Sequence, residues 1–358
     1  MRSAPDLVND RVFAGCFAHQ GRRANRTIPA TRLRHSRRAT ESIAMNSPPF
    51  IHVEDLHFAW GRQPLYQSLA VQARQPGIYG LFGRNGSGKS TLLKLLAGLL
   101  TPQRGRLQAL GFVPRQRQPQ FLAQVYLLPE EFHLPNLTPA QLQQSQAGFY
   151  PRFDAALYAD YLRELEVPQA QPFAGMSLGQ KKKAVIAFAL AAQTPLLLMD
   201  EPTNGLDIVS RTQFRALMAR PEQAQRAVLI STHQAHDLES ILDHLWFMDQ
   251  GRIVLDAAMS ALAQRLHMGV AASEADLPAH TLHREPLGQQ WAWVARREAT
   301  PAAGEAVPPV QLELLYKALS LAPQAVLAAV RGDAPGTDSS NPPAAHTPNE
   351  APRQETTP

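Results

Sequence analysis

Residues 83–91 read Gly83-Arg84-Asn85-Gly86-Ser87-Gly88-Lys89-Ser90-Thr91, which satisfies the pattern G-x-x-x-x-G-K-[ST]. An apolar run, residues 77–82, leads directly into this glycine-rich turn. Such a run predicts a strand that is buried on both faces of a parallel sheet. A helix is predicted over residues 89–99, ending before the break at Thr101-Pro102. The order strand, loop, helix is the context that identifies the pattern as a phosphate-binding loop.

The residue types in this loop suit a nucleotide phosphate. Glycines allow successive backbone N–H groups to turn inward around the β-phosphate, and the helix N-terminus adds its positive end. Lys89 supplies a cation between the β- and γ-phosphates, and the Ser90 hydroxyl can ligate Mg²⁺. A glycine-rich turn can also arise by chance, so the companions of the loop decide its meaning.

Acidic and imidazole side chains follow two further predicted strands. The apolar run 196–199 is followed by Asp200 and Glu201, and the run 227–230 is followed by Ser231-Thr232-His233. Asp200 would hold the Mg²⁺ shell, and Glu201 would accept a proton from the attacking water or orient it. His233 would contact the γ-phosphate. Each of these features alone is more often structural, so it is their combination that indicates phosphoryl chemistry.

Five segments in fixed order resemble the ABC ATPase family over about residues 51–256. They are the phosphate loop, Met176-Ser177-Leu178-Gly179-Gln180, LLLMDEP at 196–202, NGLD at 204–207 and STH at 231–233. The second of these, called here the signature segment, discriminates, because kinases and GTPases share the phosphate loop but lack it. The resemblance implies an α/β P-loop NTPase with a parallel-sheet core, an N-terminal antiparallel β part, a helical subdomain and a small C-terminal extension.

The resemblance also implies how the site is assembled. Ser177, Gly179 and Gln180 would bind the γ-phosphate of an ATP held by a second subunit, which is either another copy or a paralogous ATPase subunit. ATP would then be sandwiched in a head-to-tail dimer, with Asp207 coupling the two pockets. Leu178 departs from the family, which usually has glycine at that position, and this puts the close backbone approach there in question.

The roles carried over to this chain are therefore as follows. Glu201, His233 and Lys89 are the expected catalytic residues. Mg²⁺ is the expected cofactor of ATP, and its expected ligands are Ser90, Asp200 and Glu130. The remaining expected nucleotide contacts are Trp60, Gly83, Arg84, Asn85, Gly86, Ser87, Gly88 and Thr91.

Two of the family's roles could each fall to either of two residues in this chain. An aromatic side chain upstream of the phosphate loop normally stacks on adenine in this family, and Trp60 is preferred here over Phe58. The family also places a glutamine in a mobile loop between the lobes, where this chain has Glu130. Gln116 is the rival, but it lies 27 residues past Lys89 against 41 for Glu130. A carboxylate at this place can meet Mg²⁺ through water but cannot donate a hydrogen bond.

Three lysines, Lys181, Lys182 and Lys183, follow the signature segment directly. A run of cations on a helix is more often a solvated face than a ligand contact. We therefore expect a solvated face here rather than direct contact with the nucleotide.

Composition divides the chain into four parts. Residues 45–256 are the expected ATP-binding domain, with a helical subdomain at about 131–182, and residues 257–330 form an expected accessory subdomain. Residues 331–358 are rich in proline and polar residues and predict a disordered tail. Residues 1–44 are read as an over-called start preceding Met45, a disordered basic tail or a transit peptide. The first is preferred, because strand-like alternation begins just after Met45.

The distribution of charge, the cysteine count and the length of the apolar runs exclude several classes of protein. Nine of the 35 basic residues and three of the 30 acidic residues lie within residues 1–44, which leaves 26 basic and 27 acidic residues elsewhere. Because the basic excess belongs to that segment alone, no nucleic-acid partner is expected. A single cysteine, Cys16, excludes an internal disulfide. The longest apolar runs, residues 92–100 and 184–192, have nine residues each, so no membrane span is expected.

These observations predict the ATP-hydrolysing subunit of an ABC exporter. It would dock on separate polytopic membrane subunits near residues 130–143, at the inner face of a bacterial cytoplasmic membrane. Export is preferred because LLPEE at 127–131, SLGQKK at 177–182 and the short C-terminal extension resemble motors of export systems. The alternative is a stand-alone soluble ABC ATPase in cofactor or complex assembly. A P-loop kinase is disfavoured by the signature segment and the acid pair.

Overall fold

The computed structural model describes residues 48–234, 238–298 and 308–332. The expectation for residues 1–44 lies outside the described residues, as does that for the tail beyond Gly332.

The largest sheet has six strands in the order β5-β6-β7-β3-β8-β9. All adjacent pairs are parallel except β8 with β9. Asp200 pairs with Ser231, and Phe82 pairs with Thr232, so β3, β6 and β7 end at the same edge of the sheet. The strands are β3 (Gly77–Phe82), β5 (Val125–Leu128), β6 (Leu196–Asp200), β7 (Ala227–Thr232), β8 (His244–Asp249) and β9 (Arg252–Ala258).

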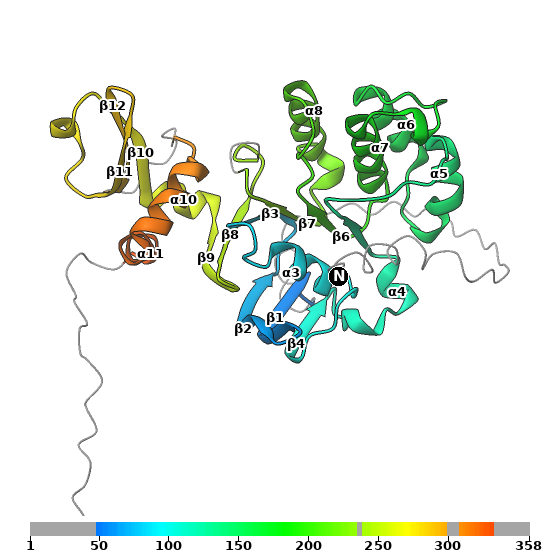
Figure 1. Ribbon diagram of the computed structural model, residues 1–358, viewed down its shortest axis with the longest axis horizontal. Helices are drawn as coiled ribbons and strands as arrows, with labels where there is room; N and C mark the ends of the chain where they lie inside the picture. The colour runs from blue at the N-terminus through cyan, green and yellow to red at the C-terminus, as the bar shows by residue number, and fades with distance from the viewer. Residues whose placement is uncertain (1–47, 235–237, 299–307, 333–358) are drawn as a thin grey trace, which may run out of the picture.

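A second sheet, antiparallel and three-stranded, has the order β2-β1-β4. It consists of β1 (Ile51–Trp60), β2 (Gln63–Ala73) and β4 (Arg104–Ala109), and it lies beside α3 (Lys89–Leu96) in Figure 1. Apolar residues of this sheet, of α3 and of the central strands form one buried cluster. The helix α3 is shorter than predicted, because Gly98 adopts φ +71 and its N–H turns back to Leu95 O.

The helical part contains α5 (Pro139–Gln146), α6 (Ala155–Glu164) and α7 (Leu178–Ala191). Residues 139–166 form two helices rather than one, since the chain turns at residues 147–154, which contain Gly148 and Pro151. Asp154 begins α6 by accepting hydrogen bonds from two backbone N–H groups. Figure 1 shows this part and the C-terminal part at opposite ends of the central sheet.

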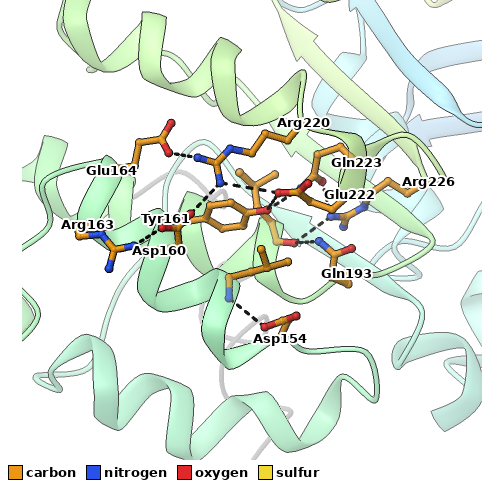
Figure 2. A network of polar contacts seen from close by, with 12 residues as sticks. Asp154, Asp160, Tyr161, Arg163, Glu164, Gln193, Arg220, Glu222, Gln223 and Arg226 are labelled. Atoms are coloured by element: carbon orange, nitrogen blue, oxygen red, sulfur yellow. Dashed lines mark hydrogen bonds and ion pairs between the residues drawn. The ribbon is translucent and has the colours of Figure 1, made fainter. Parts of the chain in front are cut away.

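A network of polar side chains joins the helical part to the core, as Figure 2 shows. Arg220 forms ion pairs with Asp160 and Glu164 of α6. The neighbouring guanidinium of Arg226 is buried and donates to Gln223 Oε1 at 2.9 Å, Thr194 Oγ1 at 2.9 Å and Leu190 O at 3.2 Å. We call this the Arg226 network; its other members are Tyr161, whose hydroxyl donates to Glu222, and Glu222 itself.

The C-terminal part is a second antiparallel sheet, β10-β12-β11, with three helices. Its elements are α9 (Met259–Arg265), β10 (Leu266–Ala271), β11 (Thr281–Leu287), β12 (Gln290–Arg296), α10 (Leu312–Leu321) and α11 (Pro323–Arg331). Residues 291–294 alternate between aromatic and aliphatic side chains and lie in β12. The predicted boundary after residue 256 falls inside β9, which pairs with β8 as far as Ala258.

The remaining helices and turns complete the description. They are α4 (Pro119–Leu122), α8 (Ile208–Met218) and 3-10 turns at Pro114–Gln116, Ala147–Phe149, Phe173–Gly175, Pro221–Gln223 and Glu274–Asp276. In the described part of the chain, no single helix has the length and apolar character to cross a membrane. Only α10 and α11 taken together do, and they meet at an angle of 117°.

Candidate nucleotide-binding site

Residues from five separate segments meet around a cavity of about 510 Å³ at the edge where β3, β6 and β7 end. Of the predicted site residues, the cavity is lined by Trp60, Asn85, Gly86, Gly88, Lys89, Ser90, Thr91, Glu130, Glu201 and His233. The parallel sheet explains this convergence, because the carboxyl ends of its strands and the loops that follow them share one edge.

The phosphate loop turns on glycines with positive φ. Gly86 has φ +81 and Gly88 has φ +114, conformations that other residues adopt only with strain. The Tyr66 hydroxyl donates to the Gly88 carbonyl oxygen at 2.5 Å and fixes the place where α3 begins. No side chain caps the N-terminus of α3. Its first backbone N–H groups therefore remain available to an anion.

Lys89 is nearly buried, with 6% of its surface exposed, and its ammonium donates to Gly83 O at 2.9 Å and Arg84 O at 3.2 Å. Burial lowers the pKa of Lys89, while the charges of Glu201, Asp200 and Glu130 act in the opposite direction. The Ser87 hydroxyl is also buried and has no hydrogen-bond partner among the described residues. A phosphate oxygen would satisfy this hydroxyl, so the loop fits the group that its sequence predicts.

Glu201 is buried at the end of β6, and two neighbours hold its carboxylate. The Thr232 hydroxyl donates to Glu201 Oε2 at 2.9 Å, and His233 Nδ1 lies 2.7 Å from Oε1. Asp200, also buried, accepts a hydrogen bond from Ser231. Together with Ser90 and Glu130, these residues offer hydroxyl and carboxylate oxygens, the hard donors that Mg²⁺ prefers.

The structure separates the two pairs of rival residues. Glu130 lines the cavity and accepts a hydrogen bond from Asn204 Nδ2 at 2.9 Å, whereas Gln116 is paired with Gln118 and does not line it. Trp60 is 46% exposed at the cavity, but Phe58 is 6% exposed and belongs to the core. The Trp60 ring meets the Phe58 ring edge-on, with centroids 5.2 Å apart, so the core supports the exposed indole.

The signature segment does not line this cavity in the same chain. Ser177 caps α7: its hydroxyl accepts from Gln180 N at 3.2 Å, and Gln180 Oε1 accepts from Ser177 N at 3.0 Å. Leu178 is 67% exposed beside them. A Cβ atom on Gly179 would lie 3.6 Å from Gly205 O, so this segment lies next to the loop that carries Asp207.

Asp207 begins α8, where its carboxylate accepts from Ser210 N at 2.7 Å. This bond holds the pKa of Asp207 below its usual range. The other two predicted contacts, Gly83 and Arg84, line a neighbouring cavity of about 640 Å³. That cavity is also lined by Glu313, Tyr316 and Lys317 of α10, an approach that the sequence did not indicate.

The prediction of a solvated face at residues 181–183 is wrong for Lys182. Its side chain is buried, and its ammonium donates to Glu201 O at 2.7 Å. Position 182 precedes the buried residues Val185 and Ile186 by three and four residues. Because residues 184–191 are all buried, the same spacing also holds for Lys181 and Lys183, so only the packing of α7 reveals the burial of Lys182.

Comparison with known proteins gives a consistent result. A family model described as ABC transporter matches residues 66–204. The cobalt import ATP-binding protein CbiO of Salmonella typhimurium is 33% identical over 224 residues, which cover 57% of this chain and 79% of that protein. The bacitracin transport ATP-binding protein BcrA of Bacillus licheniformis is 28% identical over 223 residues, which cover 60% and 72% respectively.

A solved structure, titled as that of an ATP binding subunit of an ABC transporter, superposes on this chain with a TM-score of 0.54 and 26% identity. The match covers 60% of this chain and 92% of the other. The α/β P-loop fold with its antiparallel part and helices is the one that the sequence predicted. Given these similarities and the geometry of the cavity, the chain belongs to the family of ABC transporter ATP-binding subunits and is an ATPase.

Proposed function

We propose that two copies of this chain close head-to-tail around two molecules of Mg·ATP and drive an exporter through separate membrane subunits. The observation that carries the catalytic part is Glu201, a buried carboxylate held by Thr232 and His233 in the same cavity as Lys89. A carboxylate held in this way, next to a phosphate loop, is placed to act on the water that attacks the γ-phosphate.

In the proposed reaction, a water oxygen bonds to the γ-phosphorus, and the bond from that phosphorus to the bridging oxygen of ADP breaks. The water's proton passes to Glu201, and ADP and phosphate leave. Lys89 and His233 stabilise the negative charge on the transferring group. Ser90, Asp200 and Glu130 would hold Mg²⁺, which neutralises phosphate charge when bound.

A second copy is part of the proposal because Ser177, Gly179 and Gln180 do not line the cavity of their own chain. A helix N-terminus that carries a serine hydroxyl and a glycine suits an anion. In the proposed dimer, these residues meet the γ-phosphate bound by the other copy or by a paralogous subunit. Asp207, beside the same segment, couples the two pockets. Trp60 stacks on adenine.

The names of the two relatives do not settle the direction of transport, because one states cobalt import and the other states bacitracin transport without a direction. Export is preferred for this chain on the segments 127–131 and 177–182 and the C-terminal part that follows β9. In this proposal the chain lies at the cytoplasmic face of the membrane, and residues 130–143 form the docking surface. The residues described at 257–330 form an accessory part of the motor.

Affinity purification tests the transport proposal. The Glu201→Gln chain, held with Mg·ATP, would be isolated from solubilised membranes of the native organism and its companions identified. Co-elution of a protein with several membrane-spanning helices is the expected result, with the Lys89→Ala chain as a matched control that binds ATP poorly. Only soluble companions, with the chain absent from the membrane fraction, would instead favour the stand-alone assembly ATPase.

A further inference from the structure

Lys182 is a buried cation that the proposed chemistry does not yet use. Only 4% of its surface is exposed, and its ammonium donates to the backbone carbonyl oxygen of Glu201 at 2.7 Å. Burying an ammonium group is costly unless nearby charges and hydrogen bonds compensate it. An apolar side chain would fill the same space without that cost, so the charge at this position calls for an explanation.

The backbone of Glu201 is held in an unusual conformation. Its φ is +45, in the left-handed region that residues other than glycine seldom adopt. Its carbonyl oxygen accepts from Lys182 Nζ and also from Asn204 N at 3.2 Å. Its N–H donates to Ser231 O at 3.0 Å. Strained backbone persists where its surroundings hold it, and Lys182 supplies the one charged donor in this set.

The charges around Lys182 are those of the candidate site. Glu130, Glu201 and Asp200 each act on its ammonium against the effect of burial, which lowers its pKa. The same three acids act on Lys89 of the phosphate loop. The acid cluster is thus balanced by two buried cations, one from α3 and one from α7.

The position of Lys182 along α7 gives this contact a second consequence. Ser177 caps the N-terminus of the same helix, five residues earlier, and Gly179 lies in its first turn. A helix is stiff over so short a distance. Any displacement of the signature segment therefore displaces the donor that holds Glu201.

We propose that Lys182 is a positioning residue for Glu201 and links it to the signature segment of its own chain. The inference rests on the proposed function. In this arrangement, the helix that presents Ser177 and Gly179 to the nucleotide of the second copy also holds the backbone from which its own Glu201 projects. Binding of Ser177 and Gly179 to the nucleotide of the second copy is thereby transmitted to the Glu201 carboxylate in the pocket of their own chain.

The test compares steady-state ATP hydrolysis and equilibrium ATP binding in the full chain. Lys182→Met removes the charge and the donor at similar volume, and Lys182→Arg restores both. Lys181→Met, on the neighbouring residue of the same helix, is the matched control. We expect kcat to fall about 30-fold in Lys182→Met with the Kd for ATP within about twofold, since a small misplacement of a catalytic group costs on this order.

Lys182→Arg should retain at least about a third of the wild-type kcat, and Lys181→Met should match the wild type. A merely structural role would lower kcat and the fraction of chain that binds ATP together, which would overturn the proposal. If Lys182→Met does not fold, as judged by circular dichroism, Lys182→Gln takes its place, because it keeps a shorter, neutral donor.

A double variant separates this proposal from the proposed function. In the Glu201→Gln background, Lys182→Met should lower the residual rate by less than about twofold, because Lys182 acts through Glu201. A further loss as large as in the wild-type background would show that Lys182 acts independently. If Glu201→Gln abolishes turnover but Lys182→Met keeps the wild-type kcat, this inference alone fails. If Glu201→Gln hydrolyses ATP at the wild-type rate, the proposed role of Glu201 fails, and the inference fails with it.

Discussion

Among the described residues, two clusters of charged and polar side chains differ in what they do. The cluster around Lys89 and Glu201 lines a cavity of about 510 Å³. The Arg226 network (Figure 2) joins α6 to residues 220–226. None of its members lines that cavity. Burial lowers the pKa of Arg226 to about 9, which still leaves its guanidinium charged at neutral pH. Burial of charge therefore does not by itself indicate a reactive site. The cluster around Lys89 and Glu201 differs because its charged groups line a cavity that can hold a ligand.

Among the substitutions considered, Glu201→Gln in the cluster around Lys89 should lower the activity most. We expect turnover to fall by about 10²- to 10⁴-fold, since the general base is lost while the shape of the side chain is kept. The affinity for ATP should stay within about twofold. The matched control is Glu222→Gln, the same substitution in the Arg226 network, which should leave turnover within about twofold. Steady-state phosphate release checks both variants, and equal losses would erase the distinction between the clusters.

Lys89→Ala should weaken the binding of ATP in addition to slowing the chemical step. A charge-assisted contact to phosphate contributes about 1.5–3 kcal/mol, so we expect the Kd for ATP to rise about 10- to 100-fold. Equilibrium binding of a fluorescent ATP analogue measures this change. An unchanged Kd would contradict the assignment of the phosphate loop.

Arg226→Met should lower the stability of the chain and leave its affinity for ATP unchanged. The substitution removes three hydrogen bonds and leaves the buried oxygens of Gln223 and Thr194 without this donor. We expect the free energy of unfolding to fall by about 2 kcal/mol while the Kd for ATP stays unchanged. Urea denaturation, followed with and without ATP, gives both quantities. A weakened Kd in the folded variant would place the Arg226 network within the machinery of the site.

Trp60→Ala should have the smallest effect. Stacking of a base on an aromatic ring contributes about 1–3 kcal/mol, and the lower figure suits a half-exposed indole, so the Kd for ATP should rise about fivefold. Trp291→Ala in β12 is the control and should bind ATP as the wild type does. A Kd unaffected by Trp60→Ala would return Trp60 to the role of a surface residue.

Local patterns were sufficient for the centre of the fold and much of the site. The glycine-rich loop, the apolar strands β3, β6 and β7 and the residues that follow them all lie within short, contiguous segments. Because parallel strands end at one edge, their order along the chain already placed Lys89, Glu201 and His233 together. Glu130 required the resemblance to the family, since nothing in its immediate neighbours distinguishes it from Gln116.

The parts of the fold and of the site that could not be predicted depend on contacts between segments distant in the sequence. Lys182 belongs to a run of three lysines that predicts a solvated surface, and only the packing of α7 shows that its side chain turns inward. The Arg226 network joins residues about 60 positions apart, such as Asp160 and Arg220, which no periodicity connects. In the C-terminal part, residues 291–294 alternate as a strand does and residues 310–321 have a helical pattern, and the structure has β12 and α10 there. The strands that flank β12 are defined by their pairing with it.

The proposed dimer can be tested by light scattering of the Glu201→Gln chain with and without Mg·ATP. We predict a monomer without nucleotide and a dimer at saturating Mg·ATP, because the trapped γ-phosphate connects one phosphate loop to the opposite signature segment. Adding Ser177→Arg should abolish that dimer without preventing ATP from binding. A chain that stays monomeric at saturating Mg·ATP, or a dimer indifferent to both ATP and Ser177→Arg, would contradict the shared site.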